Sequence, residues 1–194
     1  MIGIYQNKSD EQLMEGIKLG KMQAFDELYL RYSKRLLHFF FRMLYKDAEK
    51  AQDFLQDIFL KVVEKPHLFD TKKRFSTWIF AVANNMCKNE YRRLKVRRNG
   101  SIYVGDFNVT ENDIILPKIE QQIDSQHFKK LVVGELANMS EAKRSVFLLR
   151  YQEQFSIKEI SDILNCSEGT VKSRLFYTTK TLAKKLQAYN PSVL

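Results

Sequence analysis

The sequence predicts an all-α fold made of two helical domains, and three observations lead to this prediction. The 194 residues include only seven glycines and three prolines, about half the usual share of these turn-forming residues. Apolar side chains recur at three- and four-residue steps over long stretches, and no stretch shows the period-two alternation of a strand. A polar segment separates two such stretches, and a hydrophobic content of 44% is sufficient for real cores.

Three helices are predicted between the N-terminus and residue 66. Ser9 and Gln12 have the spacing of a capping box, which begins the first helix, and Gly20 is expected to end it. Apolar residues at helical spacing predict two more helices, one through Phe25, Leu28, Tyr29, Tyr32 and Leu36 and one through Ala51, Phe54, Leu55, Ile58, Phe59 and Val62. Pro66 ends the third helix, because proline cannot continue it.

A fourth helix is expected to run from Thr77 to about Leu94, with Ser76 as its N-cap. Its core side is defined by Ile79, Val82, Ala83 and Met86. A basic cluster follows at the end of this helix, formed by Arg92, Arg93, Lys95, Arg97 and Arg98. The first domain is therefore predicted to span residues 1–97.

Residues 98–125 are predicted to be a flexible acidic linker. After Arg98 this segment contains five acidic residues and a single base, Lys118, together with Gly100, Gly105 and Pro117. The alternative is one domain with a long ordered loop, but compact domains rarely contain loops of this length. We therefore expect a second domain over residues 126–194.

The second domain contains a predicted helix-turn-helix. Its helices are expected near residues 126–137, 141–151, 157–164 and 168–187. Ser156 has the position of an N-cap for the third of these helices, and Ser167 for the fourth. Asn165, between them, can adopt the left-handed conformation that a sharp turn requires. In such a motif the second helix normally enters the major groove of DNA.

The last helix has a buried stripe and an outward face. The stripe consists of Val171, Leu175, Thr178, Leu182 and Leu186. Phe176 is unusual, because it is an aromatic residue on the polar face; contact with thymine methyls or sugars would explain it, as would packing on a neighbouring helix. The DNA-binding residues expected here are Ser167, Lys172, Ser173, Arg174, Phe176 and Tyr177.

The charge of the chain favours a polyanionic partner. Lysines and arginines exceed acids to give a net charge of +9, and the commonest use of such an excess is attraction to nucleic acid. Cys87 and Cys166 are too far apart in sequence to suggest a disulfide framework or a metal-ligand pair. The N-terminus has no apolar signal segment, and the most apolar run, Leu36 to Phe41, is much shorter than a membrane span. We expect a cytoplasmic protein without membrane insertion.

The helix-turn-helix sequence, from Glu159 to Leu175, resembles the promoter-reading region of bacterial extracytoplasmic-function (ECF) sigma factors, which belong to the sigma-70 family. The resemblance is strongest over Ser-Glu-Gly-Thr-Val-Lys-Ser-Arg-Leu, residues 167–175. Ser161, Asn165 and Tyr177 differ from the residues that the family usually carries at these positions. The resemblance implies that this domain reads the minus-thirty-five element of a promoter.

A second segment, Ala51 to Val62, resembles the helix with which these sigma factors dock on core RNA polymerase. Asp53, Gln56 and Asp57 are three and four residues apart and therefore share one polar face. The polymerase-binding residues that the resemblance implies are Asp53, Leu55, Gln56, Asp57, Phe59 and Leu60. Without the resemblance, the same segment could be an acidic helix face in contact with solvent.

The fourth helix carries the third match. The family places minus-ten recognition and strand melting on this helix, with a flipped base held by the preceding loop, here Leu68 to Phe75. A narrow stripe on one side of the helix suits this task, since amides can bond base edges, an indole can stack and arginines hold phosphates. The residues expected to bind DNA are Trp78, Asn85, Asn89, Arg92 and Arg93. Trp78 could instead pack at the edge of the core.

Together these segments predict a transcription initiation factor that binds core RNA polymerase and directs it to promoter DNA. The resemblance also implies an anti-sigma factor as partner. A conventional helix-turn-helix regulator would explain the C-terminal motif but not the Trp78–Asn89 stripe. A DNA-processing enzyme would need clustered carboxylates or a nucleophile. Because His38, His67 and His127 are scattered, we expect no catalysis, no metal and no cofactor.

Overall fold

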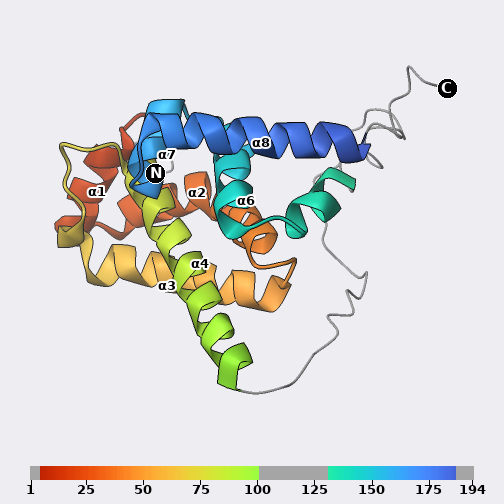
Figure 1. Ribbon diagram of the computed structural model, residues 1–194. Helices are drawn as coiled ribbons and strands as arrows, with labels where there is room; N and C mark the ends of the chain where they lie inside the picture. Colours follow the sequence, from red (N-terminus) through yellow and green to blue (C-terminus); the bar gives the residue numbers. More distant parts are fainter. Residues whose placement is uncertain (1–4, 101–130, 187–194) are drawn as a thin grey trace, which may run out of the picture.

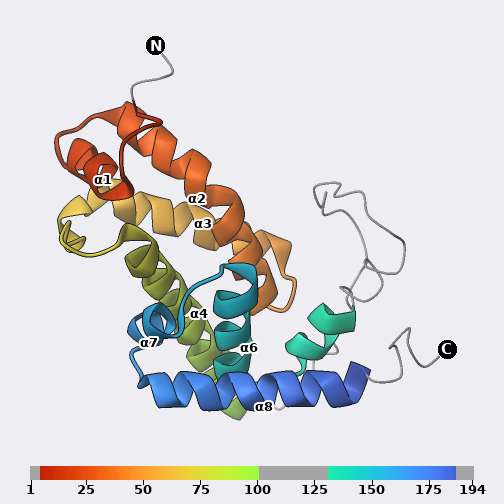
Figure 2. The same ribbon diagram turned by 90° about the horizontal axis from the view of Figure 1, so that it is seen from above.

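The computed structural model describes residues 5–100 and 131–186, which form helices and short connections (Figures 1 and 2). The N-terminal group contains α1 (Asp10–Lys18), α2 (Met22–Met43), α3 (Ala48–Glu64), the short 3₁₀-helix η1 (Pro66–Leu68) and α4 (Phe75–Gly100). The C-terminal group contains a helix over residues 131–137, α6 (Glu141–Phe147), the π-helical turn η2 (Leu148–Gln152), α7 (Ile157–Leu164) and α8 (Glu168–Leu186). The described ranges contain no strand, so the all-α prediction is confirmed. None of the described helices has the length and apolar character that a bilayer crossing requires.

Local signals in the sequence place several helix ends correctly. The Ser9 capping box forms as predicted, with Ser9 Oγ accepting from the Gln12 N–H at 3.2 Å. Gly20 follows α1 with φ at +75°, a conformation that glycine adopts without steric cost. Asn165 ends α7 in the left-handed region, with φ 48° and ψ 59°. These ends depend on residues within one turn of each other, so they can be read from sequence.

The start of α4 differs from the prediction. The helix begins at Phe75, so Ser76 is its second residue and not its N-cap. The backbone N–H of Phe75 instead donates to Oε1 of Glu11 at 2.9 Å. Glu11 lies on α1, 64 residues earlier in the chain. A carboxylate from a distant helix therefore satisfies the first amide of α4, in place of the local serine cap expected one residue later.

Two further boundaries differ from those expected. The helix α4 continues to Gly100, three residues into the segment assigned to the linker. The rest of that segment, residues 101–125, lies outside the described residues, as does the start of the helix expected at 126–137. The single helix expected over 141–151 is an α-helix only to Phe147, after which η2 inserts a π-helical turn.

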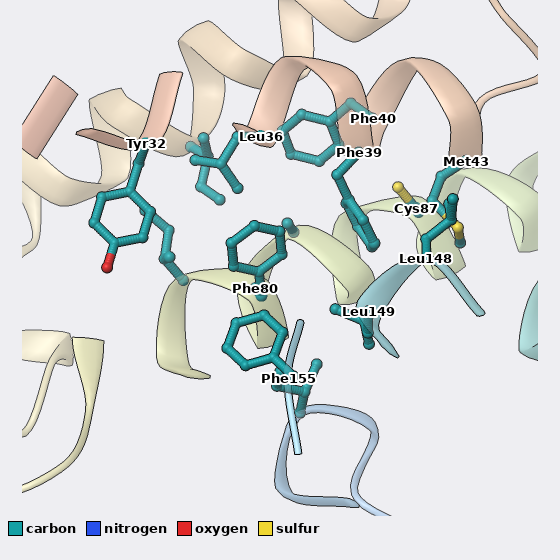
Figure 3. Close-up of a cluster of buried hydrophobic side chains, with 14 of the residues drawn as sticks. Tyr32, Leu36, Phe39, Phe40, Met43, Phe80, Cys87, Leu148, Leu149 and Phe155 are labelled. Atoms are coloured by element: carbon teal, nitrogen blue, oxygen red, sulfur yellow. The ribbon is translucent and has the colours of Figure 1, made fainter. Parts of the chain in front are cut away.

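The two helical groups pack on each other and share buried apolar side chains. The helix α7 lies against α4, and α6 approaches α2. Figure 3 shows Phe39 and Met43 of α2 and Phe80 and Cys87 of α4 facing Leu148, Leu149 and Phe155 of the C-terminal group. All seven side chains are buried. The hydrophobic core is therefore continuous from one group to the other.

A fully buried arginine, Arg144, lies where the two groups meet. Within the C-terminal group its guanidinium donates to the carbonyls of Leu136, Ala137 and Met139, at 2.7–3.0 Å. Across the junction it donates to the Met43 carbonyl at 2.8 Å and to the Tyr91 hydroxyl at 3.1 Å. These contacts use all five N–H donors of the side chain. A buried charge is tolerated because every donor has a partner.

We predict that Glu11→Ala lowers the free energy of unfolding by about 1 kcal/mol, the usual cost of losing a helix cap. Burial is the largest single influence on the pKa of Glu11 and raises it, but the hydrogen bonds from the Phe75 N–H, its own N–H and Ser9, together with the nearby Arg74, lower this pKa by more. Because the folded-state pKa is depressed, this stabilisation is complete above the ordinary value of 4.5 and is lost as the pH falls below it. Urea unfolding at neutral pH and near pH 4 checks both statements. Equal stability of wild type and Glu11→Ala at neutral pH would contradict them.

Candidate nucleic-acid and polymerase interfaces

The first candidate surface is the outward face of α8. Ser167 caps this helix as predicted, with its Oγ accepting from the Thr170 N–H at 3.1 Å. The predicted stripe is confirmed, because Val171, Leu175, Thr178, Leu182 and Leu186 are all buried. The stripe fixes the rotation of the helix about its axis, and so determines which side chains face solvent.

The side chains expected to contact DNA lie on the solvent side of α8 or at its edge. Ser167, Lys172, Ser173, Phe176 and Tyr177 are exposed, and Arg174 is half-buried. Phe176 is 59% exposed, so it does not pack on a neighbouring helix of the described chain. Its ring instead lies edge-on to Tyr177, with centroids 5.4 Å apart, and the Lys180 ammonium lies over it at 5.9 Å. The result is an aromatic and basic surface along the helix.

The second candidate surface is the side of α4 that carries Asn85 and Asn89; the other two sides of this helix pack on the rest of the protein. The core side contains Ile79 and Ala83, which are buried, while Val82 and Met86 are partly buried. Asn85 and Asn89 are exposed, one helical turn apart. The structure therefore leaves the predicted amide stripe accessible, even though α4 packs on helices on two other sides.

Trp78 and the two arginines of this stripe have partners within the N-terminal group. The Trp78 indole is half-buried and packs on Phe69 and Phe75, with ring centroids 5.3 and 5.7 Å away. Arg93 pairs with Glu90 at 2.6 Å, and Arg92 makes a long bond to Asn89 Oδ1 at 3.4 Å. Both arginines are exposed. Ion pairs at such positions are weak, so both guanidiniums remain available to a phosphate.

The third candidate surface is on α3. Asp53, Gln56 and Asp57 are exposed, and Leu60, next to them on the same face, is 54% exposed. The other two residues named for this surface, Leu55 and Phe59, are buried. The Phe59 ring packs on Phe25 and Tyr29 of α2, with centroids 5.9 and 4.8 Å away. These two side chains hold α3 in place rather than facing outward.

The described residues show no arrangement suited to holding a metal. Nowhere in residues 5–100 and 131–186 do three or more His, Cys, Asp or Glu side chains cluster as ligands would. Cys87 is buried, and burial raises the pKa of its thiol well above the ordinary value. Burial and the nearby Arg42 and Lys34 lower the pKa of His38.

The helix α4 has a second buried face that the sequence analysis did not predict. Phe80, Asn84 and Cys87 are buried, and they recur at the four- and three-residue steps of one helix face. The C-terminal group covers this face, with Phe155 against Phe80 at 5.2 Å. The sequence does contain a signal for this face, because α4 carries apolar residues on two sides, and a helix that packs on one core needs them on only one.

Two family models and several curated relatives match this chain. A model described as Sigma-70 region 2 matches residues 28–97, and one described as Sigma-70, region 4 matches residues 131–180. The RNA polymerase sigma-H factor of Pseudomonas aeruginosa is 29% identical over 184 residues, which are 93% of this chain and 95% of the relative. The ECF RNA polymerase sigma factor SigW of Bacillus subtilis is 26% identical and covers 88% of this chain and 93% of its own length. The chain belongs to the ECF sigma factors of the sigma-70 family.

This sigma factor initiates transcription at specific promoters with RNA polymerase, and its partners are core polymerase and promoter DNA. The ECF sigma-E factor of Escherichia coli is also similar, at 28% identity over 92% of this chain and 95% of the relative. The region 2 match contains α3 and most of α4. The region 4 match contains α7 and the first two thirds of α8, including every residue of the predicted recognition surface.

Two solved structures have the same fold. The sigma factor RpoE of Bartonella quintana, in complex with the anti-sigma factor NepR, aligns with a TM-score of 0.65 at 24% identity. This alignment covers 84% of the present chain and 96% of that one. CnrH, in complex with the cytosolic domain of CnrY, aligns with a TM-score of 0.68 at 19% identity, over 93% and 99% of the two chains. The two-part helical architecture is therefore shared with these proteins.

Proposed function

We propose that this sigma factor divides its work among three helices. Residues 1–97 form the domain that docks on core polymerase through α3 and reads and melts the minus-ten element through α4. Residues 126–194 form the domain that reads the minus-thirty-five element through α8, and residues 98–125 connect the two. The observation that supports this division is that each helix keeps one polar face exposed, while its other faces are buried in the protein.

The geometry of α8 suits the major groove. Its first turn presents unpaired backbone amides and the positive end of the helix dipole, and both favour a DNA phosphate. Lys172 and Ser173 point away from the buried stripe, so their polar atoms can reach base edges. Arg174 lies at the side of the helix, half-buried, where its guanidinium can hold a phosphate. Phe176 and Tyr177 then offer apolar contact to thymine methyls and sugars.

The geometry of α4 suits a separated strand. Asn85 and Asn89 present amides one turn apart, and amides pair well with base edges. The preceding loop, Leu68 to Phe75, would hold the flipped base beside Trp78. Its Lys72, Lys73 and Arg74 are exposed and supply positive charge for the strand backbone. Arg92 and Arg93, further along the helix, extend this charge.

Polymerase docking is assigned to Asp53, Gln56, Asp57 and Leu60 on α3. Three polar side chains beside one exposed leucine form a small mixed patch. Leu55 and Phe59 contribute indirectly, because they fix α3 against α2 from the buried side.

We propose that the chain has no catalytic activity of its own, needs no cofactor and acts in the cytoplasm. An anti-sigma factor is a further proposed partner, supported by the two solved structures of this fold, each of which contains such a factor or the cytosolic domain of CnrY.

Promoter-directed transcription tests the proposal as a whole. The purified chain, mixed with core RNA polymerase and promoter DNA, should produce transcripts from defined start sites. A conventional regulator would bind duplex DNA without polymerase and would not support initiation. Metal-dependent cleavage of the DNA would instead revive the enzyme alternative.

For the docking surface, Asp53→Lys combined with Asp57→Lys should weaken binding to core polymerase by a few kcal/mol, since truncated or reversed charges at a desolvated interface are costly. Both side chains are exposed, so the fold should persist, as circular dichroism would verify. A titration of labelled protein with core polymerase measures the effect. Unchanged affinity would remove α3 from the docking surface.

For the minus-ten surface, Asn85→Ala should relax the preference at one base of this element, at a cost of about 1–3 kcal/mol. Permanganate footprinting of unpaired thymines should show weaker opening while the polymerase complex still forms. Lys88→Ala, on the same helix, is the matched control. Normal opening and base preference in Asn85→Ala would make the stripe structural.

For the minus-thirty-five surface, two neighbouring cations should behave differently. Lys172→Ala should change which sequence is preferred, because a lysine that bonds guanine acceptors carries information. Arg174→Ala should lower affinity on every promoter and reduce the salt dependence by about one phosphate contact. Selection from a promoter library, repeated with each variant, separates the two effects. An even loss on all promoters for Lys172→Ala would reassign Lys172 to the DNA backbone.

A further inference from the structure

The last turns of α4 carry an exposed valine, Val96, among basic side chains. Val96 is 72% exposed, and none of the side chains described between Cys87 and the end of the helix is buried. Packing within the protein therefore does not explain an apolar residue here. Helix propensity does not explain it either, because a β-branched residue is a poorer helix former than the lysines and arginines around it. A partner outside the chain would explain it.

Val96 lies on the stripe of α4 that carries the two amides proposed to read the minus-ten element. With 3.6 residues per turn, its direction from the helix axis is within about 20° of those of Asn85 and Asn89. Arg92 and Arg93, four and three residues earlier, are its neighbours on this side of the helix. The stripe therefore continues for about two turns beyond Asn89, and it ends in an apolar side chain.

Two exposed cations flank Val96. Lys95 and Arg97 are its immediate neighbours in sequence and are both exposed, so on a helix they project about 100° to either side of it. When a helix lies in the major groove, the side chains that face the base pairs read the sequence, and lateral cations reach phosphates of the two strands. The arrangement places one apolar side chain between two phosphate-binding ones.

The end of α4 is accessible to a DNA groove. Figure 1 shows the last turns of this helix extending past α3, in agreement with the exposure of Arg92, Arg93 and Val96. Because α4 continues to Gly100, Val96 and its flanking cations all lie within the helix. The major groove of B-DNA is about 12 Å wide and admits one α-helix.

A valine at this position suits the C5-methyl group of thymine. Valine has no side-chain donor or acceptor, so it cannot recognise the hydrogen-bonding groups of a base pair. Among the base edges in the major groove, thymine alone presents a methyl group. The chain that follows α4 leads to the domain proposed to read the minus-thirty-five element, so the end of α4 is directed upstream of the minus-ten element.

We propose that Val96 reads a thymine methyl in the duplex immediately upstream of the minus-ten element, while Lys95 and Arg97 bind the flanking phosphates. The inference rests on the proposed role of α4 in minus-ten recognition. Val96 is then a specificity-determining residue for one base pair. At 1.5 Å per residue and 3.4 Å per base pair, this pair lies at most about three positions beyond the base that Asn89 contacts.

Selection from a promoter library randomised upstream of the minus-ten element tests the preference. Holoenzyme assembled from the full chain and core RNA polymerase should enrich thymine at one position. Val96→Ala should lose this enrichment, and Val96→Ile, which keeps the apolar contact, should retain it. Because alanine is the better helix former, a loss in Val96→Ala cannot come from fraying of α4. Equal thymine enrichment by Val96→Ala and wild type would overturn the inference.

Removing the methyl group from the DNA is the sharper measurement. Deoxyuridine lacks only the C5-methyl of thymidine, so at the selected position it should weaken promoter binding by wild-type holoenzyme about fourfold, the effect of burying one methyl group. Val96→Ala holoenzyme should bind the two promoters equally. If wild-type holoenzyme does not distinguish thymidine from deoxyuridine at the selected position, Val96 does not read a methyl group and the inference is wrong.

Three variants control these measurements. Leu30→Ala removes an equally exposed apolar side chain, 74% exposed, from α2 and should change neither the selected sequence nor the affinity. Lys95→Ala and Arg97→Ala should each weaken binding to both promoters alike and reduce the salt dependence by about one phosphate contact. Loss of the thymine preference in Lys95→Ala or Arg97→Ala, with none in Val96→Ala, would assign the reading to a cation and overturn the inference.

Failure of the proposed function would give a different pattern. Wild-type holoenzyme would then not open the minus-ten element, and Asn85→Ala would behave as wild type. Normal opening by wild type and the expected defect in Asn85→Ala, together with no effect of deoxyuridine, would overturn the role of Val96 alone.

Discussion

The arrangement of this protein depends on one buried guanidinium. Arg144 caps the carboxyl end of α2 by donating to the Met43 carbonyl. It also caps the carboxyl end of the helix over residues 131–137 by donating to the carbonyls of Leu136 and Ala137. Both helix ends carry partial negative charge and unpaired carbonyls, so a single cation satisfies them. Its plane also lies over the Tyr45 ring, 4.2 Å away. Carbonyl dipoles and the Tyr45 ring, rather than a carboxylate, compensate the charge of Arg144. The position of the guanidinium therefore depends on where both helices end.

The helix α4 shows how one element can serve several tasks. Its core side packs on the N-terminal group, its second apolar side packs on the C-terminal group, and only the remaining side is exposed. Because Phe80 and Ile79 are both buried although they face different directions, α4 cannot rotate to present another stripe. The exposure of Asn85 and Asn89 is thus a consequence of packing on two sides.

The parts of the fold that the sequence predicts are those determined locally. The turn at Asn165, the cap at Ser167 and the stripe from Val171 to Leu186 all involve residues within a few turns of one another. The carbonyl that Arg144 bonds in α2 is 101 residues away. The spacing of apolar residues along the chain cannot predict a contact between residues so far apart in sequence. The candidate surfaces differ in the same way. The buried and exposed faces of α8 can be predicted from a single apolar stripe, whereas the second buried face of α4 can be recognised only once the helices that pack on it are known.

The contact between Glu11 and the Phe75 amide links the folding of two helices. The acceptor for the first amide of α4 lies on α1, so α4 gains it only after α1 has formed and docked. Helix initiation is the costly step in helix formation, and here it is coupled to a residue synthesised 64 positions earlier. On the ribosome, α1 emerges well before α4, which means that the acceptor is already present when α4 begins to form. The order of synthesis thus favours the correct starting point of α4.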